Sequence, residues 1–450
     1  MWDLASIEDK FKLAQDNFQT ISSGYTWDHK TISFSFPVSA FPGTGAFLPE
    51  GEGLKYTAFT TSEIDLTIKF LDAIERAVDI DFVYDATGNG EIKFGKQNMD
   101  EWTGGYATFP APESTHAVVL SNVWAPENKS GAIGLLIHEF GHSLGLEHPH
   151  APTTPLDATL DVTSATMLSY NDFALIQGKP DYFRITSYSL MDILALQSMY
   201  GVSRKVSDDI YQADGTVSVV ADYGGTDAID ISTQRYDKAD INIVDLSRGF
   251  VYYDRKGGNW SSSIMDPDNG WTEIIDRTSD NGFYNMIITP GTVIEKVVGS
   301  AVSDRITGAS GEETLKGLGG NDRIKGGEGA DGITGGKGYD ILEGGPGDDT
   351  FGFASAVEAG KGKTCDVITD FVSGEDVIDL SGIFVKGDFS FIGKVGFHQQ
   401  AGELRAFTKD NLGNAKDATY IEGDLNGNGV ADFQIKLTGL HVLQDADFIL

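Results

Sequence analysis

Cysteine is almost absent from this chain of 450 residues, in which Cys365 is the single thiol. No disulfide can therefore form within the chain, and a secreted protein built in this way needs another stabilising element, such as bound metal. A cytosolic protein with one unreactive thiol fits the same count. The chain also opens without a basic region followed by an apolar run, so we expect no N-terminal signal peptide. No stretch approaches about 18 consecutive apolar residues, so we expect no membrane span.

Positive charge is also scarce, with 33 Lys and Arg against 67 Asp and Glu and a formal net charge of −34. Nucleic acids and anionic membranes attract basic patches, so we expect neither as a partner. The excess of carboxylates fits a highly solvated surface or calcium binding. A hydrophobic share of 40% allows a buried core, and the length allows two or three domains.

One stretch reads HEFGHSLGLEH, which has the spacing H-E-x-x-H-x-x-G-x-x-H. His138 and His142 are four residues apart, so on a helix both imidazoles lie on one face. Glu139 then lies beside the metal as a general base for the attacking water. Gly145 ends the helix and turns the chain, which brings back His148 as a third ligand. Three imidazoles suit one catalytic zinc ion and leave a coordination position open for water.

The hydrophobic pattern around this motif predicts a twisted sheet backed by helices. In the helix over residues 64–78, we expect Ile64, Ile68, Leu71, Ile74, Ala77 and Val78 to share one side. The other expected helices are residues 6–20, 131–144 and 190–201, and the expected strands are residues 31–36, 80–84, 91–94, 105–109 and 117–123.

Residues 299–352 repeat with a period of nine, in units that begin with glycine. The sixth position of each unit is acidic and the eighth is apolar, which predicts a parallel β-roll with the eighth position inside. A flexible Gly-rich linker needs neither the period nor the aligned Ile and Leu. Carboxylates and turn carbonyls supply oxygen ligands, so we expect several calcium ions, without which the carboxylates repel one another. The expected calcium-site residues are Asp304, Gly320, Asp322, Gly329, Asp331, Gly338, Asp340, Gly347 and Asp349, with Glu313 in the second unit.

The histidine motif resembles the zinc site of the metzincin peptidases. Residues 23–37 (SGYTWDHKTISFSFP) and 90–95 (GEIKFG) are similar to strands of the serralysin type within that group. The resemblance implies an edge strand that pairs with an extended substrate. The residues at its place are Gly105, Tyr106, Ala107, Thr108 and Phe109.

Serralysins carry a Met-Ser-Tyr turn under the zinc, whose Tyr is a further ligand and steadies the oxyanion. This sequence has Met167-Leu168-Ser169-Tyr170 at that place. We match Tyr170 to the family's Tyr, which puts Leu168, similar in volume to Met, in the Met position. The other register matches Met167 and leaves Tyr170 one residue late.

Further segments are similar to the serralysin C-terminal domain. Asp222, Gly224 and Asp227 resemble one of its calcium loops, and residues 365–371 and 374–381 resemble the strands after the roll. The last four residues, DFIL, resemble the export signal that an ABC-type secretion apparatus reads. The family also implies a small proteinaceous periplasmic inhibitor as a partner.

We therefore expect an α+β metzincin catalytic domain, with a twisted mixed sheet and helices, followed by an all-β domain of parallel β-roll and β-sandwich type. The expected boundaries are 1–21 for an N-terminal helix or propeptide, 22–204 for the peptidase domain and 205–450 for the calcium-binding domain. The expected function is a monomeric bacterial zinc endopeptidase, secreted without a cleaved N-terminal signal and acting on extracellular proteins and peptides. The alternative is a calcium-dependent surface or binding module with a weakened peptidase domain.

Overall fold

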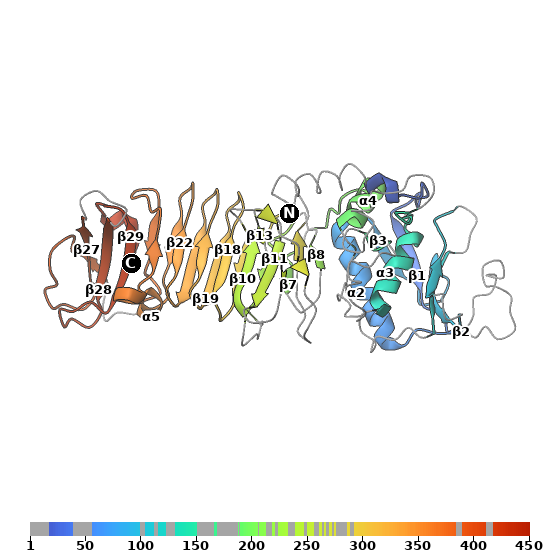
Figure 1. Cartoon of the computed structure of the whole chain (residues 1–450), viewed down its shortest axis with the longest axis horizontal. Coiled ribbons are helices and arrows are strands. Elements are labelled where there is room, and N and C mark those ends of the chain that lie inside the picture. Colours follow the sequence, from blue (N-terminus) through green and yellow to red (C-terminus); the bar gives the residue numbers. More distant parts are fainter. Residues whose placement is uncertain are drawn as a thin grey trace. The chain divides into compact units, whose positions relative to one another are not determined.

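The computed structural model (Figure 1) divides the chain into two compact units. Unit 1 comprises residues 1–206, 215–223 and 257–292, and unit 2 comprises residues 207–214, 224–256 and 293–450. The structure describes residues 18–38, 56–99, 104–111, 116–122, 131–150, 166–168, 188, 190–205, 207–212, 218–220, 224–232, 239–246, 250–255, 261–262, 265–266, 270–271, 274–275, 286–288, 292–383, 389–410 and 417–450. The helix expected over residues 6–20 lies mostly outside this range.

Unit 1 is built on a mixed sheet in the order β3-β1-β4-β6-β5, with β2 paired to β4. Strands β3, β1, β4 and β6 are parallel neighbours, whereas β5 runs antiparallel to β6 at the edge of the sheet. The strands are β1 (Thr31–Ser35), β2 (Tyr56–Thr57), β3 (Asp81–Tyr84), β4 (Ile92–Gln97), β5 (Gly105–Ala107) and β6 (His116–Ser121). Every strand expected from the sequence before the histidine motif is present.

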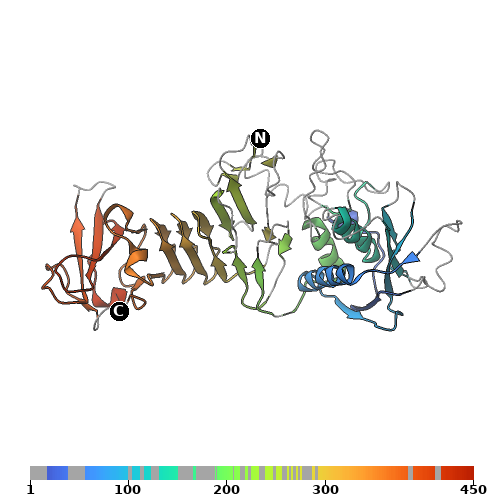
Figure 2. The same ribbon diagram turned by 90° about the horizontal axis from the view of Figure 1, so that it is seen from below.

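Helices α2 (Thr61–Ala77), α3 (Gly131–Ser143) and α4 (Leu190–Tyr200) group on one side of this sheet, as Figure 2 shows. A single core of buried side chains joins them, with Phe70 of α2, Phe94 of β4 and Phe140 of α3 among its members. The mixed sheet with helices, as expected from the sequence, is therefore confirmed. The helices of the described part of the chain are each too short or too polar to cross a lipid bilayer.

The buried face of α2 matches the expected one at Leu71, Ile74, Ala77 and Val78, but Ile68 is 42% exposed. Glu63 and Thr67 are buried instead. The Glu63 carboxylate lies 2.6 Å from the Lys96 Nζ under the sheet, and it also accepts the Thr60 N–H in a capping box. The side of α2 that carries Glu63 therefore faces Lys96 of β4, and Ile68 lies on the exposed side of the helix.

Unit 2 is an all-β roll with two sheets of mainly parallel strands, which Figure 1 shows side by side in yellow and orange. The first sheet runs in the order β30-β25-β23-β21-β19-β17-β9-β7. Its strands are β7 (Ile210–Gln212), β9 (Ala228–Asp230), β17 (Lys296–Val298), β19 (Thr314–Gly319), β21 (Gly332–Lys337), β23 (Thr350–Gly352), β25 (Val377–Asp379) and β30 (Phe448–Ile449).

The second sheet continues from the roll into an antiparallel meander of β27, β28 and β29. Its strands in unit 2 are β10 (Ala239–Asp245), β11 (Phe250–Arg255), β18 (Asp304–Thr307), β20 (Arg323–Lys325), β22 (Ile341–Glu343), β24 (Val367–Ile368), β26 (Ser390–Phe391), β27 (Glu403–Lys409), β28 (Ala418–Asp424) and β29 (Phe433–Thr438). Unit 1 holds the short strands β8 (Ser218–Val220), β12 (Ser261–Ser262), β13 (Met265–Asp266), β14 (Gly270–Trp271), β15 (Ile274–Ile275) and β16 (Met286–Ile288).

The interior of the roll consists of two rows of apolar side chains, one from each sheet. The eighth residue of each nine-residue unit is at most 1% exposed, and these residues are Ile306, Leu315, Ile324, Ile333, Leu342 and Phe351. The parallel roll with an inward-facing eighth position is thus the observed structure. One inward side chain from each strand makes a thin core for a domain, so burial of apolar surface alone gives the roll little stability.

Candidate metal centre and catalytic site

Three imidazoles meet at one point at the end of α3. The Nε2 atoms of His138 and His142 each lie 3.1 Å from Nε2 of His148. All three potential ligand atoms lie within 4.8 Å of one another, so the group could hold a metal ion. Nitrogen ligands about 2.0–2.1 Å from a tetrahedral zinc lie about 3.3 Å apart, which is close to the observed spacing.

Two of these imidazoles have a fixed tautomer. His138 Nδ1 lies 2.8 Å from the Met167 carbonyl oxygen, and His142 Nδ1 lies 2.8 Å from the Leu146 carbonyl oxygen. Each Nδ1 must therefore donate, which leaves a lone pair on each Nε2. Burial lowers the pKa of His138 to about 4 and that of His142 to about 3, so both rings are neutral at pH 7. Lone pairs that converge in this way suit a cation with nitrogen ligands.

The turn that presents His148 depends on Gly145, whose φ is +99°. A Cβ at this position would overlap the Tyr25 carbonyl oxygen, so glycine is required twice, for its dihedral and for its size. The Gly145 carbonyl accepts hydrogen bonds from the backbone N–H and the hydroxyl of Ser23, both at 2.8 Å. Glu147 N–H donates to the Ile21 carbonyl at 2.7 Å. Residues 21–23 are thus hydrogen-bonded to the turn that carries His148.

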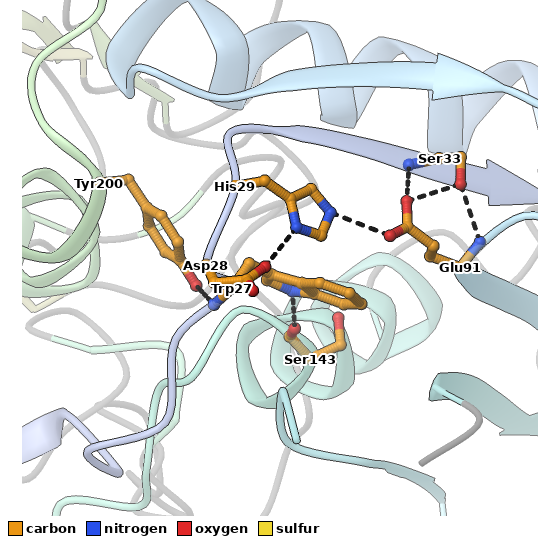
Figure 3. A network of polar contacts seen from close by, with 7 residues as sticks. All are labelled: Trp27, Asp28, His29, Ser33, Glu91, Ser143 and Tyr200. Atoms are coloured by element: carbon orange, nitrogen blue, oxygen red, sulfur yellow. Dashed lines mark hydrogen bonds and ion pairs between the residues drawn. The ribbon is translucent and has the colours of Figure 1, made fainter. Parts of the chain in front are cut away.

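Figure 3 shows Trp27, which follows these residues in the chain, at the carbonyl of Ser143, the last residue of α3, with Tyr200 of α4 beside it. Trp27 Nε1–H donates to the Ser143 carbonyl at 2.9 Å, and the Tyr200 hydroxyl donates to the Leu144 carbonyl at 2.8 Å. The Tyr200 oxygen also accepts the Trp27 N–H at 3.2 Å. Carbonyls at a helix end lack partners within the helix, so these donors fix where the helix stops.

The network of Figure 3 continues from Trp27 to the sheet through His29. His29 Nδ1 lies 2.6 Å from Asp28, and its Nε2 lies 2.9 Å from Glu91. The hydrogen bond to Asp28, followed by the charge of Glu91, raises the pKa of His29 despite its partial burial. Glu91 in turn accepts from the backbone N–H and the hydroxyl of Ser33 in β1. The segment that supports the third histidine is therefore tied to the central strands.

A short described segment, residues 166–168, supports His138 from below. Asp192 of α4 accepts the Thr166 hydroxyl at 2.6 Å and the Met167 N–H at 2.8 Å, and Met167 then offers its carbonyl to His138. Leu168 is fully buried, and its side chain packs directly against Gly141 of α3. Sequence reasoning missed Asp192, although a single acidic residue inside the apolar helix LMDILALQSMY was a usable signal. Tyr170 lies outside the described residues.

Glu139 lies between the histidines and the edge strand. Its side chain is buried, and burial raises its pKa to about 8. Strand β5 pairs with β6 on one side, and no strand of the described chain pairs with its other side. Thr108 continues this pairing through its N–H and its hydroxyl to Ala117, and the Phe109 ring lies 5.4 Å from the His142 ring. The structure thus brings the expected edge strand and the expected base together.

Two family models match the chain, the matrixin model over residues 27–178 and the serralysin C-terminal model of M10 peptidases over residues 278–450. The serralysin of Photorhabdus sp. (strain Az29) is 34% identical over 390 residues, which cover 77% of this chain and 71% of that protein. The metallopeptidase AprA of Pseudomonas marginalis is 30% identical over 80% of this chain and 74% of its own. The serralysin of Photorhabdus luminescens is 34% identical over 77% of this chain and 71% of its own.

The chain belongs to the serralysin family. It is therefore a zinc metalloendopeptidase of the metzincin group, which confirms the enzyme class expected from the sequence. The alternative, a binding module with a weakened peptidase domain, is not favoured by any feature of the metal centre described above.

The acidic side chains of this serralysin's roll form ladders along both sheets. Asp304, Asp322 and Asp340 each donate their N–H to the carboxylate 18 or 26 residues further on, at 2.8 Å, and Asp366 ends this row. Glu313, Asp331 and Asp349 form the second row in the same way, and Asp376 ends it. Sequence reasoning found the six acids of the repeat but missed Asp366 and Asp376, because the spacing changes after the last unit.

Each ladder leaves oxygen atoms without partners. Among the described residues, the buried Oδ2 atoms that lack a hydrogen bond include those of Asp322, Asp331, Asp340, Asp349 and Asp366. Burial raises the pKa of Asp322 to about 8 and that of Asp366 to about 9. Buried and partnerless carboxylate oxygens are costly unless a cation binds them, and hard oxygen ligands suit calcium.

The turns between these strands use the expected glycines. Gly320, Gly329, Gly338 and Gly347 have φ between +119° and +152°, which only glycine adopts readily. Of the other expected calcium loop, Asp222 lies outside the described residues. Asp227 is buried, accepts the Asp209 N–H at 2.9 Å and donates its own N–H to Glu295 at 2.7 Å, while the Gly224 carbonyl accepts the Ser207 N–H.

Proposed function

We propose that His138, His142 and His148 hold the catalytic zinc ion and that Glu139 is the general base. The observation that carries this proposal is the convergence of three Nε2 atoms, two of which carry a lone pair set by their tautomers, beside the buried Glu139 side chain. Zinc in this position would polarise the scissile carbonyl and activate a water molecule. Glu139 takes a proton from the attacking water and passes it to the leaving amine.

The substrate is an extended peptide that adds to the free side of β5. Backbone N–H and C=O groups of residues 105–109 would bind it by strand addition, so affinity depends little on side chains. This arrangement lays the scissile bond across the face of α3 that carries Glu139 and His142. Tyr170, matched to the family's tyrosine, would stabilise the oxyanion. The contact of buried Leu168 with Gly141 supports the register in which Leu168 takes the Met position.

Calcium ions would stabilise the roll in residues 299–352, bound by the acidic ladders and turn carbonyls. Support comes from the partnerless buried Oδ2 atoms and from the thin apolar core. We assign residues 22–204 to the peptidase domain and residues 205–450 to the calcium-binding domain. Removal of an N-terminal segment within residues 1–21 has to spare Ile21, because its carbonyl holds the turn that carries His148.

We further propose that the protein is secreted and acts outside the cell, as the family implies. The last residues, DFIL, would be read by an ABC-type secretion apparatus before they fold. In the folded chain this segment forms β30, paired with β25, with Asp447 buried. A small proteinaceous periplasmic inhibitor, as in the family, would be a further partner.

The substitution Glu139→Gln tests the catalytic proposal. It keeps the size of the side chain and removes the proton acceptor, so kcat should fall by roughly 10²–10⁴. Zinc content, measured by atomic absorption, should stay near one per chain because the three imidazoles are untouched. Asp72→Asn on the exposed face of α2 serves as the control and should cleave peptides at the normal rate. Near-normal turnover of a zinc-loaded Glu139→Gln chain would refute the mechanism.

A further inference from the structure

Strand β5 begins at Gly105 and is preceded by Gly104, and the backbone requires neither glycine. Neither Gly104 nor Gly105 is among the glycines with positive φ, so any residue could adopt their dihedrals. Side chains alternate along a strand, and Tyr106 packs with Val119 on the face away from the helices, whereas Ala107 packs against the main core. Position 105 therefore faces the helices, and the contacts of its missing side chain show what lies there.

A side chain at position 105 would press against the Glu139 side chain. A Cβ built on Gly105 lies 2.9 Å from Cγ and 3.0 Å from Oε1 of Glu139, and 3.0 Å from the Val119 carbonyl oxygen. A Cβ built on Gly104 would lie 3.0 Å from Cδ1 of Leu135, which precedes Glu139 by one turn of α3. Residues four apart on a helix share a face, so Leu135 and Glu139 form the row of α3 that lies under the edge strand.

We propose that Gly105 is a positioning residue for the general base. Because Gly105 has no side chain, the Glu139 carboxyl group can lie directly against the edge strand. Gly105 also belongs to the stretch of β5 that we propose to pair with the substrate backbone. Any larger residue pushes this carboxyl group away from the attacking water while it leaves the three histidines in place. This inference rests on the proposed role of Glu139 as general base.

The consequence concerns rate rather than binding. A catalytic group displaced by about 1 Å can lose roughly 100-fold in rate, because proton transfer needs a hydrogen-bonded geometry. The backbone N–H and C=O groups of β5 that pair with the substrate are the same in glycine and alanine. The KM for a peptide should therefore change little while kcat falls.

The experiment is a double-mutant cycle of Gly105→Ala and Glu139→Gln in the full chain, with Gly104→Ala as the matched control. Gly105→Ala should lower kcat by about 10- to 100-fold, with KM and zinc content retained. In a chain that already carries Glu139→Gln, the same substitution should cost nothing further, because the group it displaces no longer acts. Gly104→Ala meets only the flexible end of Leu135 and should keep most of the activity.

The inference would be overturned by full activity of Gly105→Ala, by an equal loss of activity in Gly104→Ala, or by an equal further loss in the Glu139→Gln background. Loss of zinc from Gly105→Ala would also overturn it, because the substitution would then disturb the metal centre as a whole rather than the Glu139 side chain alone. A fully active Glu139→Gln chain is a separate outcome, which would refute the proposed base itself.

Discussion

Removal of calcium should make the stability of the roll depend on pH in an unusual direction. Burial raises the pKa of Asp322 from 3.8 to about 8 and that of Asp366 from 3.8 to about 9. An acid whose pKa is higher in the folded state binds its proton more tightly there than in the unfolded chain. Without calcium, the roll should therefore be most stable below about pH 4 to 5 and lose stability as the pH rises through 8 to 9.

The size of this effect follows from the shift. Each pKa unit corresponds to about 1.4 kcal/mol, so ionising buried Asp322 alone costs of the order of 5 kcal/mol. Asp366 adds a cost of similar order, and whole domains are stable by only about 5–15 kcal/mol. The calcium-free roll should thus unfold at pH 9 and persist at pH 5. Calcium bound as proposed would reverse this pH dependence of stability, because its carboxylate ligands must be deprotonated.

The assay is hydrogen exchange of peptides from residues 299–352 in the full chain, stripped of calcium on a chelating resin, at pH 5 and pH 9. Protection, corrected for the intrinsic exchange rate, should be lost at pH 9 and return when calcium is added. The variant Asp322→Asn removes one ionisation at nearly constant shape, so its calcium-free roll should resist high pH better. Protection that is equal at both pH values in the stripped chain would refute this reasoning.

Two further predictions concern the support of the metal centre. Asp192→Asn keeps one acceptor oxygen in place of two and loses the charge, so its hydrogen bonds to the Thr166 hydroxyl and the Met167 N–H weaken, the carbonyl that orients His138 is held less firmly, and zinc affinity should fall about 10- to 100-fold. A zinc competition titration would show this, with Asp72→Asn as the control, and unchanged affinity would contradict it. Trp27→Phe removes the bond to the Ser143 carbonyl but keeps a ring, so the unfolding free energy of the zinc-loaded chain should fall by about 1 kcal/mol. An unchanged urea denaturation midpoint would argue against a capping role.

The features that the sequence predicted well are those set by local spacing. The two histidines of α3 need only the helical repeat, and His148 needs only a glycine that turns the chain, which Gly145 does at φ +99°. The nine-residue period predicts the backbone of the roll even at Leu318. This residue stands where the next units have glycine, and it also has a positive φ, of +74°. Regular neighbours impose the turn even on a residue that disfavours it.

The features that the sequence did not predict depend on contacts between distant segments. Asp192 supports the turn at Met167 from 25 residues away, and Trp27 caps a carbonyl 116 residues away. No periodicity carries such pairs, because each forms only after the sheet and the helices have packed. The burial expected for Ile68 of α2 was wrong for the same reason, since the buried partner of Glu63 on this helix is Lys96 of β4, a contact between distant segments.

The acidic ladder obeys a rule that is wider than the nine-residue repeat. In the first sheet of the roll, every strand follows directly on an acidic residue, although only three of these acids belong to the repeat. The acids, in chain order, are Asp209, Asp227, Glu295, Glu313, Asp331, Asp349, Asp376 and Asp447. Where the strands are neighbours, the N–H of one acid often donates to the carboxylate of the next, as from Asp227 to Glu295 and from Asp349 to Asp376.

This rule explains why the ladder survives where the spacing does not. A residue just before a strand has an N–H that the strand ladder does not yet use, and an acid at the same level of the next strand satisfies it. The length of the connecting loop is irrelevant to that bond. An acid placed immediately before a short β-branched or aliphatic strand is therefore a better guide to the extent of such a roll than glycine periodicity. By this criterion the first sheet of the roll begins with the strand after Asp209 and ends with the strand after Asp447, so it reaches beyond residues 299–352 on both sides.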